Sequence, residues 1–288
     1  MTETVHETDR HALTCMEIWG GNQAFDNAVS VPGIDAWVYS RPFGEGETGG
    51  DVHYVSMCGC GEIGRFFLAD LSGHGQSASP PAADVRRLMR KYINTLNQTD
   101  FVRSLNDRMM AWKRQGQFAT TLLSTYFAPT KQMLICNAGH PAPLWYRAAD
   151  RKWRWLQPET SGQPPGAAAA DNLPVGVVEG TEYIQFAVEL EKDDRVLIYS
   201  DSLYESRDAS GEQLGRRGLL RLMNDLTDLP PDEQAHTLVE RLVTHHGSSD
   251  LEDDLTIMLL HHHGEGQVET TMVERLRTMG RMLGLLRV

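Results

Sequence analysis

The sequence predicts an α+β protein in which strands and helices form separate layers. Strand-like and helix-like segments come in blocks along the 288 residues, with no strict alternation of strand and helix. Such blocks favour an α+β layer architecture over a doubly wound parallel sheet. With 41% hydrophobic and 23% charged residues, the composition is that of a globular chain. No internal repeat or linker is evident, so we predict one main domain.

The first block is rich in strand signals. Residues 1–33 are polar and mixed, and we expect an N-terminal arm or a short leading strand there. Residues 34–40 fit a strand, and the loop that follows contains four glycines and a proline between positions 42 and 50. Residues 52–57 and 65–70 fit two strands that a glycine-rich spacer joins, which is the pattern of a hairpin.

Helices and strands then follow in blocks. One apolar stripe with helical spacing runs through residues 85–96, and Asp100 is a suitable cap for a second helix. Short strands are predicted at residues 121–128, 132–137, 153–156, 183–188 and 195–200. Helical spacing returns at residues 219–226 and 232–243, and residues 255–260 fit a last strand. These elements place the main domain at residues 34–263, and an amphipathic helix is predicted within residues 264–288.

Charge and cysteine content exclude several classes of protein. Lys and Arg number 27 against 39 Asp and Glu, for a formal charge of −12. This balance disfavours nucleic acid and anionic membrane surfaces as partners. No apolar run approaches the ~20 residues that span a bilayer, and the first residues lack the apolar stretch of a signal peptide. Four cysteines make no disulfide framework, so we expect a soluble, cytoplasmic protein.

Aspartates lie at the ends of several predicted strands. Asp51 opens one strand, Asp70 and Asp201 close two others, and Asp253 and Asp254 precede the last. Each of them alone is most often a turn or cap residue. Together, they come from distant parts of the chain and would repel one another in a shared site unless cations lay between them.

The chemistry of these side chains predicts a hard divalent cation. Carboxylate oxygens without thiolates favour Mg2+ or Mn2+ over zinc. Two such ions can activate a water and neutralise a phosphoryl group, which suits hydrolysis of a phosphate ester. Gly73 and Gly75 follow Asp70 closely and would let the backbone approach a metal or a phosphate, although a tight turn before the helix explains them too.

Five blocks then match a known family in order. They are residues 49–51 (GGD), 69–75 (ADLSGHG), 137–143 (NAGHPAP), 199–205 (YSDSLYE) and 253–256 (DDLT). The chain resembles the SpoIIE/RsbU-type branch of the metal-dependent PPM (type 2C-like) phosphatases over residues 34–262. The resemblance implies a four-layer αββα sandwich, with two antiparallel β-sheets flanked by helices. It also implies two or more Mn2+ or Mg2+ ions that hydrolyse phosphoserine or phosphothreonine on a protein.

The resemblance also assigns roles to residues of this chain. Asp70 would bridge both metals, and the family's nucleophile is a metal-bridging water. The first metal would be held by Asp51 and the Leu71 carbonyl, and the second by Asp201 and Asp253. Asp254 is the less favoured member of its pair, because related pairs in the family use the first residue.

The sequence departs from the family at two places. Ser202 stands where the branch usually has glycine, and residues 52–54 (VHY) replace an aromatic pair followed by aspartate, which removes an acid. No arginine is clearly placed for the substrate phosphate. Arg41 is one candidate, and a solvated loop cation is the alternative.

Histidines complete the candidate site. His74, beside the bridging ligand, is a candidate to orient water or to protonate the leaving group, or else it packs near the site. His140 fits a structural turn residue. Residues 261–263 (HHH) alternate in direction along a strand, so they fit a solvated strand end better than a metal cluster.

The predicted function is therefore a metal-dependent serine/threonine protein phosphatase. The resemblance suggests a phosphorylated STAS-domain protein, an anti-sigma-factor antagonist, as substrate in a bacterial partner-switching pathway, with a separate activator protein. A terminal apolar stripe fits docking, a homodimer, or packing on its own domain: Met272, Leu276, Met279, Met282, Leu283 and Leu286. The alternatives are a catalytically weak phosphoprotein-binding scaffold and a hydrolase of small phosphate esters or nucleotides.

Overall fold

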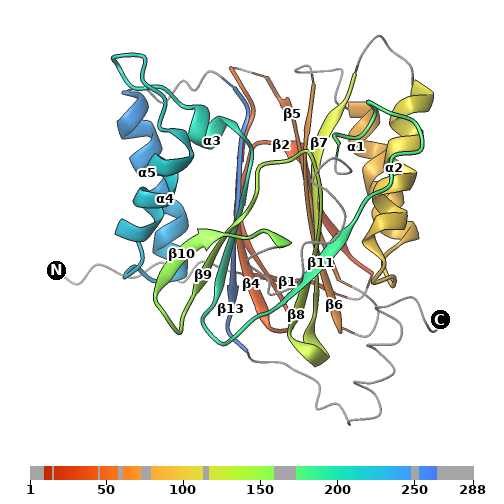
Figure 1. Cartoon of the computed structure of the whole chain (residues 1–288), viewed down its shortest axis with the longest axis horizontal. Helices are drawn as coiled ribbons and strands as arrows, with labels where there is room; N and C mark the ends of the chain where they lie inside the picture. Colours follow the sequence, from red (N-terminus) through yellow and green to blue (C-terminus); the bar gives the residue numbers. More distant parts are fainter. Residues whose placement is uncertain are drawn as a thin grey trace.

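Two β-sheets lie face to face between two layers of helices (Figure 1). The structure is a computed structural model that describes residues 10–14, 16–44, 46–57, 61–72, 79–112, 117–158, 173–247 and 253–264. Apolar side chains of both inner sheet faces form one core between the sheets. The four layers confirm the predicted αββα architecture.

The two sheets interleave segments from both ends of the chain. One sheet has seven strands in the order β1 (His11–Ala12), β3 (Phe25–Val31), β4 (Ile34–Arg41), β13 (Leu255–His262), β12 (Arg195–Tyr199), β9 (Leu144–Arg147) and β10 (Lys152–Trp155). The other has six in the order β11 (Gln185–Glu189), β8 (Gln132–Ala138), β7 (Ala119–Phe127), β6 (Ile63–Leu71), β5 (Thr48–Met57) and β2 (Ile18–Gln23). Neighbouring strands run antiparallel except β1 and β3, which are parallel.

The helices cover the two outer sheet faces. On the six-stranded sheet lie α1 (Ser79–Lys91) and α2 (Gln98–Trp112), and their apolar faces form a second core with β5, β6 and β7. On the seven-stranded sheet lie α3 (Ser202–Glu205), α4 (Gly215–Asp225) and α5 (Pro231–His246), which form a third core. A 3-10 turn, Ala128–Thr130, connects β7 to β8.

Both sheets are inner layers, so their strands are buried on both faces. Side chains alternate along a strand, and successive residues therefore enter different cores. In β5, Val52 and Tyr54 face the helices, whereas Val55 and Met57 face the other sheet. The central strands are consequently nearly continuous apolar runs in the sequence. Whether a polar residue at the end of such a strand faces the helices or the other sheet depends only on its place in the alternation.

The N-terminal region differs from the predicted arm. Residues 11–31 form three strands, of which β2 pairs with β5 and β3 pairs with β4 along its whole length. The β3–β4 turn places Gly33 at φ +85°, with the Tyr126 hydroxyl too close for any side chain. The sequence of β3 lacks an apolar pattern because about half of its residues are exposed or partly exposed. Polar side chains are tolerated at those positions. Two short elements, β9 and α3, were also not predicted.

Several predictions fall outside the described residues. These are the helix within residues 264–288, of which only residue 264 is described, and residues 73–78, which include His74. They stay predictions. Among the described helices, none is both long and apolar enough to cross a membrane.

Candidate metal centre

Asp51 and Asp70 lie directly opposite each other on neighbouring strands. The β5–β6 register pairs their Cα atoms, so both side chains lie on the same face of the six-stranded sheet. That face is the inner one. Along β6, Asp70 points to the same side as Phe66 and Leu68, and those two side chains belong to the core between the sheets. Like charges at such a position are destabilising unless a cation or protons offset them.

Burial makes the Asp51 carboxyl hard to ionise. Its exposed fraction is 3%, and desolvation raises its pKa well above the usual value, with a further increase from the charge of Asp70. Hydrogen bonds from Ser200 and Thr256 of the facing sheet oppose this rise in pKa. The other carboxyl oxygen, Oδ2, is buried without any hydrogen-bond partner. A buried oxygen of this kind is a suitable ligand for a cation.

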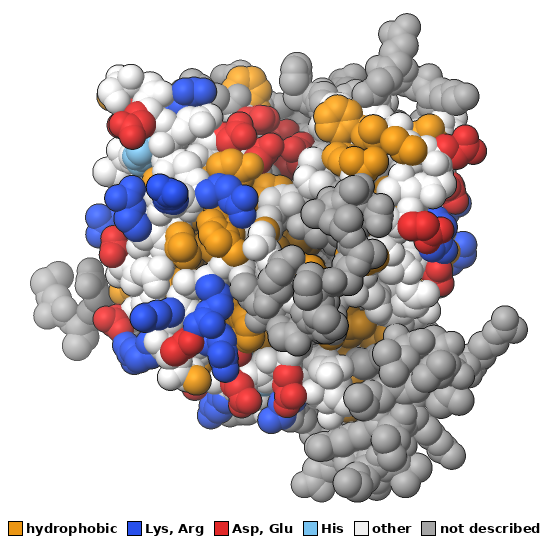
Figure 2. All heavy atoms as spheres, in the orientation of Figure 1, with side chains coloured by type: hydrophobic (Ala, Val, Ile, Leu, Met, Phe, Trp, Pro, Cys, Tyr) orange, Lys and Arg blue, Asp and Glu red, His pale blue; other side chains and the backbone are white. Residues whose placement is uncertain are grey.

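Asp70 is affected by acids from several parts of the chain. Burial raises its pKa to about 7, and the next causes are the charges of Asp201, Asp253, Asp254 and Glu205, in that order. Strand β6 and the segments before α3 and β13 therefore bring their carboxylates into one region. Figure 2 shows acidic side chains gathered at the top of the view, near the position of α3 in Figure 1.

Asp201 lies between β12 and α3, directly before the first residue of the helix. Burial raises its pKa, and the charges of Glu205 and Asp253 raise it further. Glu205 is an exposed acid for which the sequence predicted no role. Its spacing of four residues from Asp201 is the available signal, since residues i and i+4 share one side of a helix. The four residues of α3 were too short to be recognised as a helix.

The structure separates the roles of Asp253 and Asp254. The Asp254 carboxylate accepts backbone N–H groups from Phe43 at 2.6 Å and Gly50 at 2.5 Å. It also lies so close to Gly49 that a Cβ there would be 2.5 Å from Oδ1. Asp253 is exposed, and its Oδ1 accepts the Asp254 N–H at 2.8 Å. Asp254 therefore shapes the loop before Asp51, whereas Asp253 is more accessible to an ion.

The donor set fits a hard divalent cation. Asp51, Asp70, Asp201 and Asp253 offer oxygen ligands, and Leu71 ends the same strand as Asp70. Within the described ranges, no three Asp, Glu, His or Cys side chains already lie together as ligands of one ion. The carboxylates nevertheless act on one another, because the charges of Asp201 and Asp253 raise the pKa of Asp70, and the charge of Asp253 raises the pKa of Asp201.

The other candidates lie in different surroundings. Arg41 is half-buried at the end of β4, and its Cα pairs with Leu255, next to Asp254. His140 is buried and its Nδ1 lies 2.8 Å from the Thr120 hydroxyl, as expected for a structural residue. His74 lies outside the described residues.

The predicted solvated strand end at residues 261–263 is wrong. His262 is fully buried, and its ring nitrogens contact the Tyr126 hydroxyl at 2.8 Å and the Glu191 carbonyl at 2.7 Å. His261 and His263 lie on the opposite side of the strand and are only partly exposed. The alternation of the three side chains does separate them, as predicted, because neighbouring residues on a strand point in opposite directions.

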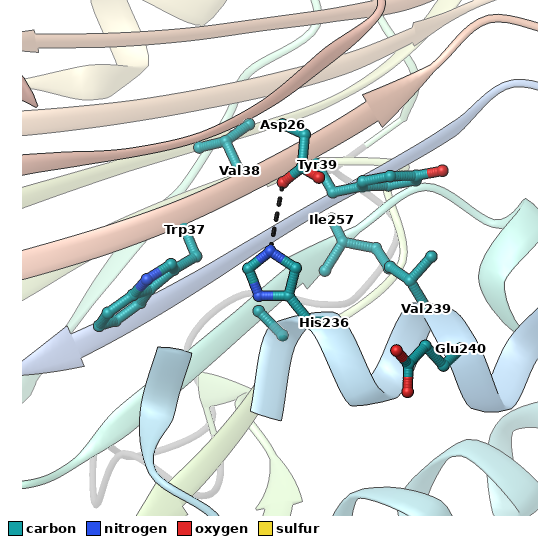
Figure 3. Close-up of a pocket in the computed structure, with 9 residues that line it drawn as sticks. Asp26, Trp37, Val38, Tyr39, His236, Val239, Glu240 and Ile257 are labelled. Atoms are coloured by element: carbon teal, nitrogen blue, oxygen red, sulfur yellow. Dashed lines mark ion pairs between the residues drawn. The ribbon is translucent and has the colours of Figure 1, made fainter. Parts of the chain in front are cut away.

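A pocket elsewhere in the structure has the wrong charge for a phosphate. It lies between α5 and the outer face of β4 and β13, and Figure 3 shows an ion pair between Asp26 and His236 at 3.6 Å. Glu240 and apolar side chains complete its lining, with Trp37 and Tyr39 among them. Two carboxylates around an apolar pocket disfavour a phosphate ester as its ligand.

The fold and the gathered acids define a protein with the PP2C phosphatase fold. A solved structure of the RsbU and RsbW domains of a Mycobacterium tuberculosis protein matches with a TM-score of 0.66 and 20% identity, over 88% of this chain and 70% of that one. The PP2C phosphatase domain of SpoIIE from Bacillus subtilis, solved with a fragment of its regulatory domain, matches with a TM-score of 0.63 and 16% identity, over 85% of this chain and 70% of that one.

The chain belongs to the SpoIIE family, because the family model of Stage II sporulation protein E matches residues 64–263. A curated relative, phosphoserine phosphatase RsbU of Bacillus subtilis (strain 168), is 23% identical over 194 residues, which is 67% of this chain and 54% of RsbU. The chain thus spans about half the length of that relative.

Proposed function

We propose that this chain is a metal-dependent phosphatase that acts on phosphoserine or phosphothreonine in a protein. The observation that carries the proposal is the Asp51–Asp70 pair, which is largely buried between the sheets and electrostatically coupled to further acids. Such a pair is costly unless cations compensate it. Phosphatase activity is also supported by membership of the SpoIIE family and by the name of the relative, phosphoserine phosphatase RsbU.

The proposed ligands divide between two ions of Mn2+ or Mg2+. Asp70 would contact both ions, and Asp51 with the Leu71 carbonyl would complete the first site. Asp201 and Asp253 would hold the second. When bound, such ions lower the pKa of a water and offset phosphoryl charge.

Other residues would orient these ligands. Ser200 and Thr256 of the facing sheet lower the pKa of Asp51 and so favour its ionised form, which is the form that binds a cation. Asp254 holds the backbone at Gly50 and so fixes the start of the segment that carries Asp51. We retain His74 as the candidate that protonates the leaving serine or threonine oxygen, because it follows Asp70 by four residues in the sequence.

We propose a phosphorylated STAS-domain protein, an anti-sigma-factor antagonist, as the substrate, in the cytoplasm of a bacterium and under the control of a separate activator protein. Support comes from the RsbU relative and from a solved chain in which RsbU and RsbW domains occur together. We also propose that the catalytic domain begins at β1 and not at residue 34, since β2 and β3 are parts of the two sheets.

The alternative is a phosphoprotein-binding scaffold of weak activity. Its support was the segment 52–54, which lacks the family's additional aspartate. Tyr54, at that position, faces α1 and donates its hydroxyl to the Ala82 carbonyl, on the sheet face opposite to Asp51. An acid there would not join the Asp51–Asp70 pair, so its absence is weak evidence against catalysis.

Phosphate release by the purified chain tests the proposal. The substrates are a phosphorylated STAS-domain protein, a phosphoserine peptide and a nucleotide, each with Mn2+, with Mg2+ and with a chelator. We expect metal-dependent release from the phosphoprotein and none after Asp70→Asn. Tight binding of phosphoprotein without release would favour the scaffold, whereas release only from the nucleotide would favour the small-ester hydrolase.

A further inference from the structure

The loop formed by residues 139–143 connects the two sheets near the acids. It leaves β8 of the six-stranded sheet and enters β9 of the seven-stranded sheet. Asn137 closes the loop on itself, because its Oδ1 accepts the His140 N–H at 2.8 Å and its Nδ2 donates to the His140 carbonyl at 2.9 Å. The position of the His140 ring is therefore set by the loop.

On the six-stranded sheet, His140 contacts the strand that neighbours Asp70. Its Nδ1 lies 2.8 Å from the hydroxyl of Thr120. The β6–β7 register pairs Thr120 directly with Asp70, so both side chains lie on the inner face of the sheet. Asp51, Asp70 and Thr120 thus form one row across β5, β6 and β7.

On the seven-stranded sheet, the same loop contacts the strand that leads to Asp201. Tyr199 donates its hydroxyl to the Ala142 carbonyl at 2.8 Å, and Asp201 follows two residues later. Burial lowers the pKa of His140 to about 3, while the main chain of Tyr199 acts in the opposite direction. The ring is therefore neutral: its Nδ1 contacts Thr120, and its Nε2 is buried without a hydrogen-bond partner. The loop reaches β12 through the Ala142 carbonyl.

We propose that the Thr120–His140 hydrogen bond sets the separation between Asp70 and Asp201 and thereby the affinity for divalent cations. This inference rests on the proposed function. Thr120 and His140 are positioning residues, because neither belongs to the proposed ligand set. The carboxylates come from opposite sheets, so a defined distance between them requires a contact that crosses from one sheet to the other.

Thr120→Val tests the inference, because it removes the hydroxyl and keeps the shape of the side chain. Mn2+ binding to the substrate-free protein is measured by titration calorimetry, well below the unfolding temperature. Loss of a residue that orients metal ligands typically costs about 10–100-fold in metal affinity, and we expect a loss in that range. Thr120→Ser keeps the hydroxyl and is expected to restore the affinity. Excess Mn2+ is expected to restore the turnover of Thr120→Val.

Tyr126→Phe is the matched control. It removes the Tyr126–His262 hydrogen bond of 2.8 Å, which also joins β7 to the seven-stranded sheet but lies at the other end of β7. We expect it to lower the unfolding temperature and to leave the Mn2+ affinity unchanged.

Two results would overturn the inference alone: wild-type affinity in Thr120→Val, or an equal loss of affinity in Tyr126→Phe. If the wild-type chain itself bound no divalent cation, the proposed function would fail as well.

Discussion

Asp70 is the side chain on which the electrostatics of the site converge. We expect Asp70→Asn to abolish metal-dependent turnover and to weaken Mn2+ binding by more than the roughly 10–100-fold typical of an outer-shell change, because the substitution removes a proposed ligand. The metal-free variant should be at least as stable as the wild type at neutral pH, since burial and nearby acids raise the Asp70 pKa to about 7 and the amide carries no charge. Turnover assays and thermal unfolding in chelator check both statements. Retained activity would contradict the assignment of Asp70.

Asp253 and Asp254 are expected to respond differently to the same substitution. Asp253→Asn should weaken metal binding with little effect on folding, because its side chain is exposed. Asp254→Asn should destabilise the fold by about 1–3 kcal/mol, since it disturbs one buried and one partly buried hydrogen bond from backbone N–H groups. Denaturant unfolding of the two metal-free variants measures the difference. Equal stabilities would show that the Asp254 contacts contribute little.

Helix α1 is held to the sheet by a buried arginine. Arg65 lies on β6 with 1% exposure and donates to the carbonyls of Tyr92 and Thr95, just after the end of the helix. Arg65→Met would leave these carbonyls without that donor, so we expect a loss of about 3 kcal/mol in the free energy of unfolding. Arg90→Met, at an exposed position of the same helix, should change stability by less than about 0.5 kcal/mol. Similar values for the two variants would mean that Arg65 does not anchor α1.

Some strands could be predicted from the apolar pattern of the sequence, and others could not. The inner strands of both sheets were predicted because burial on both faces demands apolar residues almost throughout, as in β5 and β6. Strands β2 and β3 were missed because each contains polar residues and β2 contains two glycines. Their strand conformation comes from pairing with β5 and β4, a long-range interaction that local sequence does not report.

Two groups of buried side chains contribute to the pH dependence of the metal-free protein in opposite directions. His53 and His140 have pKa values lowered by burial to about 4 and about 3, so below pH 6.5 the unfolded chain binds protons that the folded chain does not. Stability is therefore lost as the pH falls below that value. Burial raises the pKa values of Asp51, Asp70 and Asp201 from the ordinary value of 3.8, so the folded chain holds extra protons, and stability is lost as the pH rises from that value through about 7. Below pH 6.5 this loss opposes the gain from the histidines.

Bound metal should mainly change the part of the pH dependence that the carboxyl groups control. In chelator, we expect the unfolding temperature to fall as the pH rises from about 6.5 to 8, because above 6.5 the histidines are neutral in both states and only the carboxyls lose protons on unfolding. Saturating Mn2+ should stabilise the protein more at pH 8 than at pH 5, because protons compete with the ion for the carboxylates at the lower pH. Thermal unfolding across this range, with and without Mn2+, measures the effect. Equal stabilisation at both values would contradict a carboxylate metal site.

The candidate site could be predicted in part. The aspartates at the ends of strands were visible because polar residues interrupt apolar runs there, and the same five blocks pointed to the family to which the chain belongs. Glu205 was not assigned because its nearness to Asp201 depends on a helix of four residues. The sequence also could not reveal that Asp254 binds the backbone of Gly50 near the start of β5, 204 residues away.

The sequence by itself determined the fold class and the residue types at the strand ends, because burial between layers demands apolar strands and leaves the polar residues at their ends. Only the tertiary structure decided that Asp51 faces Asp70 and that His140 contacts Thr120 beside them. Those relations depend on strand register and on which sheet each strand joins. Both are set by packing between segments that are remote along the chain, so no local pattern encodes them.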